Sequence, residues 1–321
     1  MAKVLGIDLG GTKIKAVLYE FGCAPGGGAD SDCCSEFGVG AGAPSGSEAR
    51  CEFKILRLEK INTGAGRGLP VVYEDLLTLV KSFLHEGISA VGIGVPGPVP
   101  SNGIPLKMPN IPDSENFDIA GKLERDTKLP VSVTNDVNCF LIAEKVFGEG
   151  KNYKDLLGIT MGTGIGGAII INNELVKSRD GVAGEFGHMI LDKQNNLSLE
   201  NLCSGTAIAR RFRETSGKSF CAREIHDMAI NKNPDALEFY RQIGHDFGIG
   251  ILNLILCFNP EFIVLGGATS RAFPFMEESM RKVLDEQGFE QSNKIKIVRT
   301  KISGAGTLGA AYLALRLPFS M

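Results

Sequence analysis

After two residues the chain runs Lys3-Val4-Leu5-Gly6-Ile7-Asp8-Leu9-Gly10-Gly11-Thr12-Lys13, an apolar stretch that ends in a carboxylate and a glycine turn. Residues 3–8 predict a buried strand, and the alternating residues 12–20 predict the second strand of a hairpin. Gly10 and Gly11 expose backbone N–H groups, and the Thr12 hydroxyl can donate to a phosphate oxygen. Asp8 could hold Mg²⁺ directly or through water. An ordinary hairpin turn is the alternative, since the Gly-Lys-Ser/Thr ending of a P-loop is missing.

A second glycine turn follows the same design in the other half of the chain. Residues 156–160 and 167–171 predict a strand pair around Gly162-Thr163-Gly164. Gly266-Gly267 follows an apolar strand at 262–265, where α/β proteins bind nucleotides, although a plain strand-to-helix turn would look the same. Two turns of one kind, each after an apolar strand, favour a phosphate cradle more than either turn alone.

Three polar groups complete the candidate chemistry. Asn135-Asp136 follows the predicted strand 131–134, where a carboxylate can be held rigidly as a general base or can cap the next helix. Glu185 and His188 lie three positions apart in Gly184-Glu185-Phe186-Gly187-His188. A lone histidine is usually structural, but this glycine-flanked pair indicates a pocket for a polar small molecule. Such a pocket beside a phosphate cradle indicates a kinase.

Composition excludes several classes of protein. With 321 residues, 43% hydrophobic and 22% charged, the chain fits a soluble globular protein of one large or two ordinary domains. A net charge of −3 gives no footprint for nucleic acid, and no apolar run is long enough for a membrane. Without a signal peptide, we expect a cytoplasmic protein whose eight cysteines are reduced. The spacing of Cys23, Cys33, Cys34 and Cys51 does not match a zinc site.

The remaining pattern predicts an α/β protein of two related halves with a cleft between them. Further strands are expected at 51–61 and 90–95, and helices at 72–85, 116–128, 235–257, 273–287 and 307–316. The helix at 116–128 should be capped near Asn116 or Asp118. Residues 22–50 are rich in Gly, Ala and Ser, and we expect them to form an extended or mobile hairpin tip.

The order of these motifs resembles the ROK family (repressors, open reading frames and sugar kinases) of the actin-like ATPase superfamily. The resemblance covers nearly the whole chain except residues 22–50, and rests on Asp8–Thr12, Gly94–Val99, Asn135–Asn138, Gly162–Gly167, Ala183–His188 and Leu265–Gly267. It implies two actin-like (ribonuclease H-like) α/β domains with a cleft between them. The smaller would span 1–117, with 22–50 as an insertion and 307–321 completing it, and the larger 118–306.

The resemblance also implies a role for each motif. Asp136 would take the proton from a sugar hydroxyl, and Asn135, Glu185, His188 and Glu200 would bind sugar hydroxyls. The turns at Gly10-Gly11-Thr12-Lys13 and Gly162-Thr163-Gly164 would face phosphate, Gly266-Gly267 would face adenosine, and Asp8 would hold Mg²⁺ through ATP. The family closes two domains over ATP–Mg²⁺ and a hexose, which suits phosphoryl transfer because that reaction needs positioning and charge neutralisation. Dimers are common in the family, so a homodimer is expected.

One departure from the family concerns zinc. Many members carry a zinc site built from the histidine that matches His188 and three cysteines just before the equivalent of Glu200. Here residues 189–199 contain no cysteine, and Cys203 alone cannot rebuild four ligands. We therefore predict no structural zinc, which leaves His188 to the sugar.

The resemblance leaves the substrate open. A glucokinase making the 6-phosphate is the first hypothesis, and an N-acetylmannosamine or N-acetylglucosamine kinase or a fructokinase is the alternative. Loops near Asn62-Thr63-Gly64 and Met108-Pro109-Asn110 would set the space at carbon 2, which makes Asn110 a further candidate sugar ligand. The phosphate donor could be ATP or polyphosphate. A sugar-responsive repressor is disfavoured, because Asp8 lies too near the start for a preceding DNA-binding domain and the charge is acidic.

Overall fold

The computed structural model describes residues 1–23 and 51–316, so most of the predicted hairpin tip lies outside the described residues. The chain divides into two compact units. The first contains Met1–Asn152, Glu174–Ala183 and Ile302–Met321, and the second contains Tyr153–Asn173 and Gly184–Lys301. The predicted division between residues 117 and 118 falls inside the first unit, because the strand at Val131–Asn135 pairs within that unit's sheet.

The first unit is built on a five-stranded sheet in the order β3-β2-β1-β4-β5. The strands are β1 (Ala2–Leu9), β2 (Lys13–Cys23), β3 (Cys51–Asn62), β4 (Ala90–Val95) and β5 (Val131–Asn135). β1, β2 and β3 pair antiparallel, whereas β4 and β5 continue the sheet parallel to β1. The register places Asp8 beside Lys15 on one side and Gly94 on the other.

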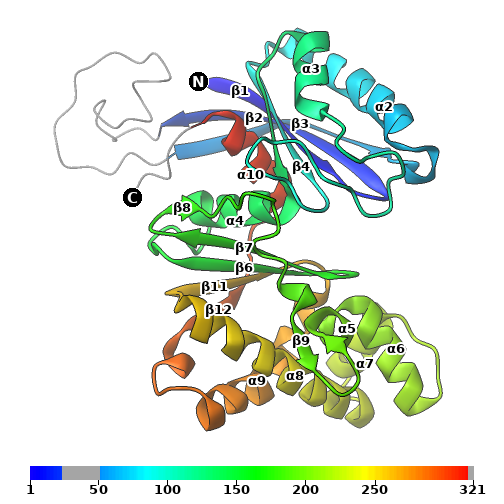
Figure 1. Cartoon of the computed structure of the whole chain (residues 1–321), viewed down its shortest axis with the longest axis vertical. Helices are drawn as coiled ribbons and strands as arrows, with labels where there is room; N and C mark the ends of the chain where they lie inside the picture. Colours follow the sequence, from blue (N-terminus) through cyan, green and yellow to red (C-terminus); the bar gives the residue numbers. More distant parts are fainter. Residues whose placement is uncertain (24–50, 317–321) are drawn as a thin grey trace, which may run out of the picture. The chain divides into compact units, whose positions relative to one another are not determined.

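Helices cover both faces of this sheet (Figure 1). Leu5, Ile7 and Leu9 of β1 join the hydrophobic core that includes buried side chains of α2 (Leu69–Lys81) and α3 (Ile119–Thr127). On the other face lie α10 (Ala305–Ala314) and α4 (Asp136–Phe147), which pack on each other. The 3₁₀ turns of this unit are η1 (Ala65–Arg67) and η2 (Leu84–Glu86).

α10 approaches the sheet closely because the strands beneath it carry glycine. A Cβ built on Gly6 would lie 1.9 Å from the Thr307 carbonyl oxygen, and one on Gly92 would lie 1.7 Å from that of Ala310. A Cβ on Gly309 would lie 1.7 Å from the Cys139 carbonyl oxygen of α4. These contacts involve backbone on both sides, so they fix the position of α10 without adjustable side chains.

The second unit contains most of a second five-stranded sheet, in the order β12-β11-β6-β7-β8. Its strands are β6 (Leu156–Met161), β7 (Ile165–Ile171), β8 (Glu174–Leu175), β11 (Phe262–Gly266) and β12 (Lys296–Arg299). A short hairpin of β9 (Ile190–Asp192) and β10 (Leu197–Ser198) leads into the helices α5 (Leu199–Cys203), α6 (Gly205–Ser216) and α7 (Ala222–Ile230). The long α8 (Pro234–Phe258) packs against α9 (Phe273–Gln287). The 3₁₀ turns are η3 (Phe186–His188), η4 (Thr269–Ala272) and η5 (Ser292–Lys294).

The predicted fold class is confirmed at the level of two α/β units with mixed sheets. The strands predicted at 3–8, 51–61, 90–95, 131–134 and 262–265 are all present, and α3 is capped by Asp118, whose side chain accepts from Gly121 N. The helix predicted at 72–85 begins earlier, at Leu69, because Gly68 and Pro70 start it, and it ends at Lys81. The helix predicted at 307–316 runs from Ala305 to Ala314.

Candidate functional site

The first glycine turn closes the β1–β2 hairpin. Gly10 N donates to Lys13 O over 3.1 Å, and Leu9 pairs with Ile14 on the two strands. Buried Thr63 supports the turn: its hydroxyl donates to Gly10 O over 2.6 Å and its N–H to Thr12 O over 2.9 Å. None of these bonds uses the N–H groups of Gly11 or Thr12, the groups that would face a phosphate.

Asn110 lies beside this turn. A Cβ built on Gly11 would lie 3.8 Å from that of Asn110, whose backbone adopts a left-handed φ of 66°. The loop that carries Asn110 is held by Ser114, whose buried hydroxyl accepts from Met108 N over 2.9 Å. The structure therefore brings Asn110 to the phosphate turn of the first unit.

Asp8 is partly buried at the carboxyl end of β1. Burial raises the pKa of its carboxyl, and the ammonium group of Lys15, its neighbour across the strands, offsets part of that rise. The amino-terminal end of α10 also approaches Asp8, since a Cβ on Gly306 would lie 3.7 Å from Asp8 Oδ2. A helix amino terminus stabilises negative charge, so both neighbours favour an ionised Asp8.

Asn135 and Asp136 stand where β5 passes into α4. The predicted cap exists, but Asn135 provides it: its Oδ1 accepts from Val137 N over 2.8 Å and from Asn138 N over 3.4 Å. Asn135 Nδ2 donates to Gly97 O over 3.0 Å, which ties the cap to the loop after β4. Asp136 is the first residue of α4 and is partly buried, and its Oδ1 accepts from Val137 N over 2.9 Å.

Asp8 and Asp136 are brought together around Cys139. Gly94 of β4 lies between their strands, and a Cβ there would be 3.1 Å from Cys139 Sγ and 3.4 Å from Asp136 Cα. Burial, and after it the negative charges of Asp136 and Asp8, raise the pKa of the Cys139 thiol. The first unit thus gathers two carboxylates at the ends of β1 and β5, over a glycine that leaves room between them.

The second glycine turn closes the β6–β7 hairpin in the other unit. Gly162 N donates to Gly164 O over 2.9 Å, and exposed Thr163 lies between them. Gly162 O accepts from Gly205 N over 2.8 Å and from the Thr269 hydroxyl over 3.2 Å. The turn is therefore attached to the start of α6 and to η4 through a carbonyl oxygen.

Gly266 and Gly267 reach the same place from β11. Gly267 has a φ of 81°, and a Cβ on it would lie 2.2 Å from Met161 O at the end of β6. Ser270 of η4 holds the bend, because its hydroxyl donates to Gly267 O over 2.8 Å. The predicted phosphate turn and the predicted adenosine-side glycines are thus neighbours within the second unit.

Glu185, His188 and Glu200 also lie together in this unit. His188 Nε2 is 3.8 Å from Glu185 Oε2, with the His188 side chain 79% exposed. Burial raises the pKa of Glu185, the nearby His188 lowers it, and the negative charge of Glu200 raises it. Glu200 acts on this pKa because the two carboxylates lie near each other. Glu200 Oε2 accepts a hydrogen bond from Ile165 N over 2.8 Å, so one carboxylate oxygen of Glu200 is bonded to the residue that follows the glycine turn.

A model of the ROK family matches residues 49–317, more than half of the chain. The chain belongs to the ROK family. It is 28% identical to the glucokinase of Thermotoga maritima, over 96% of both chains. It is 29% identical to the N-acetyl-D-glucosamine kinase of Haemophilus influenzae, over 76% of this chain and 88% of that one.

Solved structures agree with this membership. A ROK family glucokinase from Streptomyces griseus, in complex with glucose and AMPPNP, superposes with a TM-score of 0.76 at 27% identity. The match covers 98% of this chain and all of that one. The predicted ROK membership is confirmed, and with it the prediction that the chain is a phosphotransferase.

The ROK motifs do not account for every residue at these sites. Supporting contacts that were not predicted come from Lys15, Thr63, Cys139, Thr269 and the run Gly304-Ala305-Gly306. The sequence predicts Thr63 only as part of a loop near carbon 2 of the sugar, not as a support of the phosphate turn. Only the glycine run carried a signal of its own, since it repeats the glycine pattern of the other turns. The remaining four depend on strand order and helix packing, which spacing along the chain does not reveal.

No metal site emerges among residues 1–23 and 51–316, where no three His, Cys, Asp or Glu side chains gather as metal ligands would. The absence of structural zinc stays a prediction, to be checked by metal analysis of the purified protein. In the same described part of the chain, no helix combines the length and the apolar character that crossing a membrane requires.

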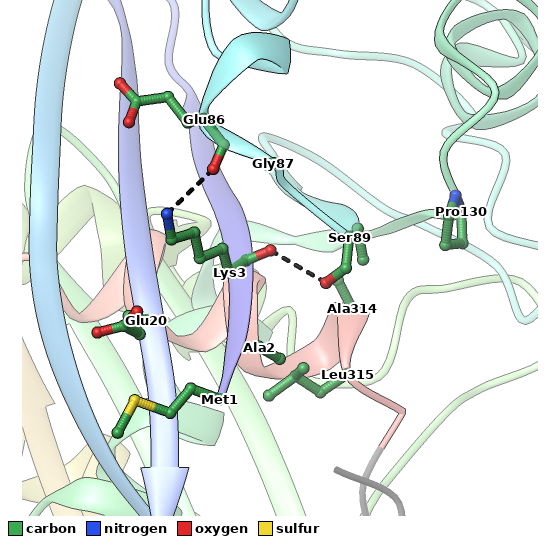
Figure 2. A pocket seen from close by; sticks show the side chains of 11 residues that line it. Met1, Ala2, Lys3, Glu20, Glu86, Gly87, Ser89, Pro130, Ala314 and Leu315 are labelled. Carbon is green, nitrogen blue, oxygen red and sulfur yellow. Dashed lines mark hydrogen bonds between the residues drawn. The ribbon is translucent and has the colours of Figure 1, made fainter. Parts of the chain in front are cut away.

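A hollow of about 880 Å³ lies at the other end of β1, away from Asp8 (Figure 2). Lys3 crosses it: its ammonium group donates to Glu86 O over 3.1 Å, and the Ser89 hydroxyl donates to Lys3 O over 3.0 Å. These bonds tie the start of β1 to the segment before β4. The polar groups of Lys3 and Ser89 in the hollow therefore have structural partners. None of the candidate catalytic groups line the hollow.

Proposed function

We propose that this ROK protein transfers the γ-phosphate of ATP to the 6-hydroxyl of a hexose, and that the hexose is glucose. The observation that carries the proposal is the gathering of Asp8 and Asp136 around Cys139, beside the Gly10–Lys13 turn. Asp136 would accept the proton of the sugar hydroxyl. The oxygen of that hydroxyl would bond to the γ-phosphorus as the bond between the γ-phosphorus and the bridging oxygen of ADP breaks. The products are sugar 6-phosphate and ADP.

Asp136 suits the role of base because its carboxylate is held at a helix start by backbone. The capping bonds of Asn135 fix the strand-to-helix turn, so the carboxylate needs little reorganisation before proton transfer. Positioning of this kind matters more than covalent chemistry in phosphoryl transfer.

Asp8 is the proposed contact for Mg²⁺–ATP. Mg²⁺ is commonly bound in proteins by one or two carboxylates together with substrate phosphates and water. A single carboxylate beside a glycine turn fits that donor set, and Lys15 and the α10 amino terminus favour its charged form. The turns Gly10-Gly11-Thr12-Lys13 and Gly162-Thr163-Gly164 would supply N–H groups and hydroxyls to the phosphates, and Gly266-Gly267 would lie on the adenosine side.

The sugar would be bound by Asn135, Glu185, His188 and Glu200, with Asn110 as a further candidate. Carboxylates and an imidazole are suited to sugar hydroxyls because each can accept a hydrogen bond in a fixed direction. The nearness of Glu185, His188 and Glu200 within one unit supports this assignment. ATP as donor is supported by the AMPPNP complex of the Streptomyces griseus relative, since AMPPNP is an ATP analogue.

Glucose is favoured over N-acetylhexosamine by the coverage of the glucokinase relative, which extends over nearly the whole of both chains. N-acetylglucosamine or N-acetylmannosamine remains the second candidate, because a relative of almost the same identity is an N-acetyl-D-glucosamine kinase. A homodimer is a further proposal that rests on the family resemblance, and a cytoplasmic location is a proposal that rests on the lack of a long apolar run in the sequence.

A substrate panel tests the proposal. Sugar phosphate formation would be measured with glucose, N-acetylglucosamine, N-acetylmannosamine, mannose and fructose, each with ATP and with polyphosphate. We expect the highest kcat/KM for glucose with ATP, and phosphorus NMR should place the phosphate on carbon 6. A preference for an N-acetylhexosamine would select the second candidate, and no transfer to any of these sugars would contradict the proposed activity.

A further inference from the structure

Glu200 is carried by α5, a helix of only five residues, and both of its ends are held by side chains. At the amino-terminal end, the Ser198 hydroxyl accepts from Asn201 N over 3.2 Å and Asn201 Oδ1 accepts from Ser198 N over 3.2 Å. So short a helix has little stability of its own. Its orientation, and that of Glu200, must therefore come from the groups that hold it.

Arg211 holds the carboxyl-terminal end. Its Nη1 donates to Leu202 O over 2.7 Å and lies 2.8 Å from Asp246 Oδ2 on α8. The side chains of Arg211 and Asp246 are only 21% and 22% exposed, so solvent weakens this pair less than a surface pair. The last carbonyl groups of a helix lack hydrogen-bond donors within the helix. Arg211, which lies on α6, supplies a donor to one of them, Leu202 O.

α5 in turn holds the second glycine turn. Glu200 Oε2 accepts from Ile165 N at the start of β7, and a Cβ on Gly164 would lie 2.4 Å from the same oxygen. Gly205, which directly follows the cap residue of α5, donates its N–H to Gly162 O. The turn is therefore held at Ile165 by Glu200 of α5 and at Gly162 by Gly205, the first residue of α6.

We propose that Arg211, fixed by Asp246, is a positioning residue that orients Glu200 and, through Glu200, the Gly162–Ile165 turn. Oε2 of Glu200 is committed to the turn and Oε1 is left for the sugar. The same carboxylate thus joins sugar binding to phosphate binding. This role rests on the proposed function for its kinetic consequences, but the contacts themselves are independent of it.

Lysine cannot reproduce the arrangement. The rigid planar guanidinium directs the N–H groups of Nη1 to Leu202 O and Asp246 Oδ2 at fixed angles, whereas a lysine ammonium is a compact charge on a flexible four-carbon chain. Arg211→Lys should therefore keep a positive charge near Asp246 but weaken the hydrogen bond to Leu202 O that orients the end of α5. Arg211→Met should lose both contacts.

The test compares Arg211→Met and Arg211→Lys with Arg213→Met, an exposed arginine on the same helix. Hydrogen exchange at the Ile165 amide should accelerate about tenfold in Arg211→Met, less in Arg211→Lys, and not at all in Arg213→Met. In the assay, kcat/KM for sugar and for ATP should both fall roughly tenfold or more in Arg211→Met, because a small misplacement of binding groups slows transfer strongly.

The two measurements separate the possible failures. Unchanged exchange at Ile165 in a folded Arg211 variant would overturn the positioning role. A rise in the sugar KM with an unchanged ATP KM would also overturn it, because Glu200 would then not act on the turn. If the wild type phosphorylates no sugar, the proposed function fails, but faster exchange at Ile165 would still support the link from Arg211 to the turn. If Arg211→Met does not fold, the Arg211→Lys exchange rate decides.

Discussion

The two units place similar groups by different means. Both carry a glycine turn on a hairpin of a mixed five-stranded sheet, at Gly10–Lys13 in one and Gly162–Gly164 in the other. In the first unit, Asp8 and Asp136 sit at strand ends under helices that lie on glycine backbone. In the second, Glu185 directly precedes the 3₁₀ turn η3, and Glu200 sits on the five-residue α5, which is held by side-chain hydrogen bonds. The contacts between α10 and the sheet of the first unit should therefore tolerate no added atoms, whereas α5 of the second unit should depend on individual polar partners.

Adding one methyl group to the first unit should have the largest effect on stability. In Gly92→Ala the new Cβ would lie 1.7 Å from the Ala310 carbonyl oxygen, so α10 must move away from β4. We expect a loss of about 3 kcal/mol in the free energy of unfolding, at the upper end for overpacked cores. Denaturant unfolding measures it.

Gly66→Ala is the matched control for that variant. Gly66 has open space around its Cβ position and an ordinary φ, so the same methyl group should change stability by less than about 0.5 kcal/mol. Equal losses in the two variants would show that the close contact of α10 with the sheet is not what limits the first unit.

Removing the cap of α4 should cost less, because the helix keeps its core contacts. Asn135→Ala removes one of the two side-chain acceptors for Val137 N, the acceptor for Asn138 N and the donor to Gly97 O, and should cost about 1–2 kcal/mol. Asn135→Asp keeps the cap and loses the bond to Gly97 O. A thermal melt should therefore rank the variants as wild type, then Asp, then Ala, and an aspartate variant no better than alanine would show that the Gly97 bond matters more than the cap.

The smallest effect concerns pH and the second unit. Burial raises the pKa of Glu185 above its ordinary value of 4.5, so the folded state binds this proton more tightly than the unfolded state. The stability linked to Glu185 is therefore complete below pH 4.5 and is lost as pH rises through the raised pKa. Glu185→Gln should remove this loss, and its stability relative to wild type should be higher at pH 7 than at pH 4. Parallel pH profiles of unfolding for the two proteins would contradict the shift.

The strand-end motifs could be predicted because each one pairs a short apolar run with glycine or a carboxylate. Asp8, the Gly162–Gly164 turn and Gly267 all follow this pattern, and the structure brings them to strand ends as expected. The sequence left the role of Asp136 open between a helix cap and a general base. In the structure Asn135 is the N-cap of α4, so Asp136 is not needed for that role and is proposed as the base.

Other features could not be predicted because they depend on the packing of distant segments. Cys139 comes near Asp8 only because β4 lies between β1 and β5, and Lys15 lies beside Asp8 only through the register of the β1–β2 hairpin. α5 is too short for a helical period to show in the sequence, so its support by Arg211 was invisible. The boundary predicted after residue 117 came from the order of motifs, whereas the unit boundary follows the pairing of β5 with β4.

The most direct test of the proposed chemistry is rapid quench of Asp136→Asn with ATP and glucose, together with glucose binding by the same protein. The amide keeps the shape of the side chain and cannot accept the proton. We predict that phosphate transfer slows by roughly 10²- to 10⁴-fold, the usual contribution of a general base, while the glucose Kd stays within about threefold. Transfer at close to the wild-type rate would contradict the assignment of Asp136 as the base.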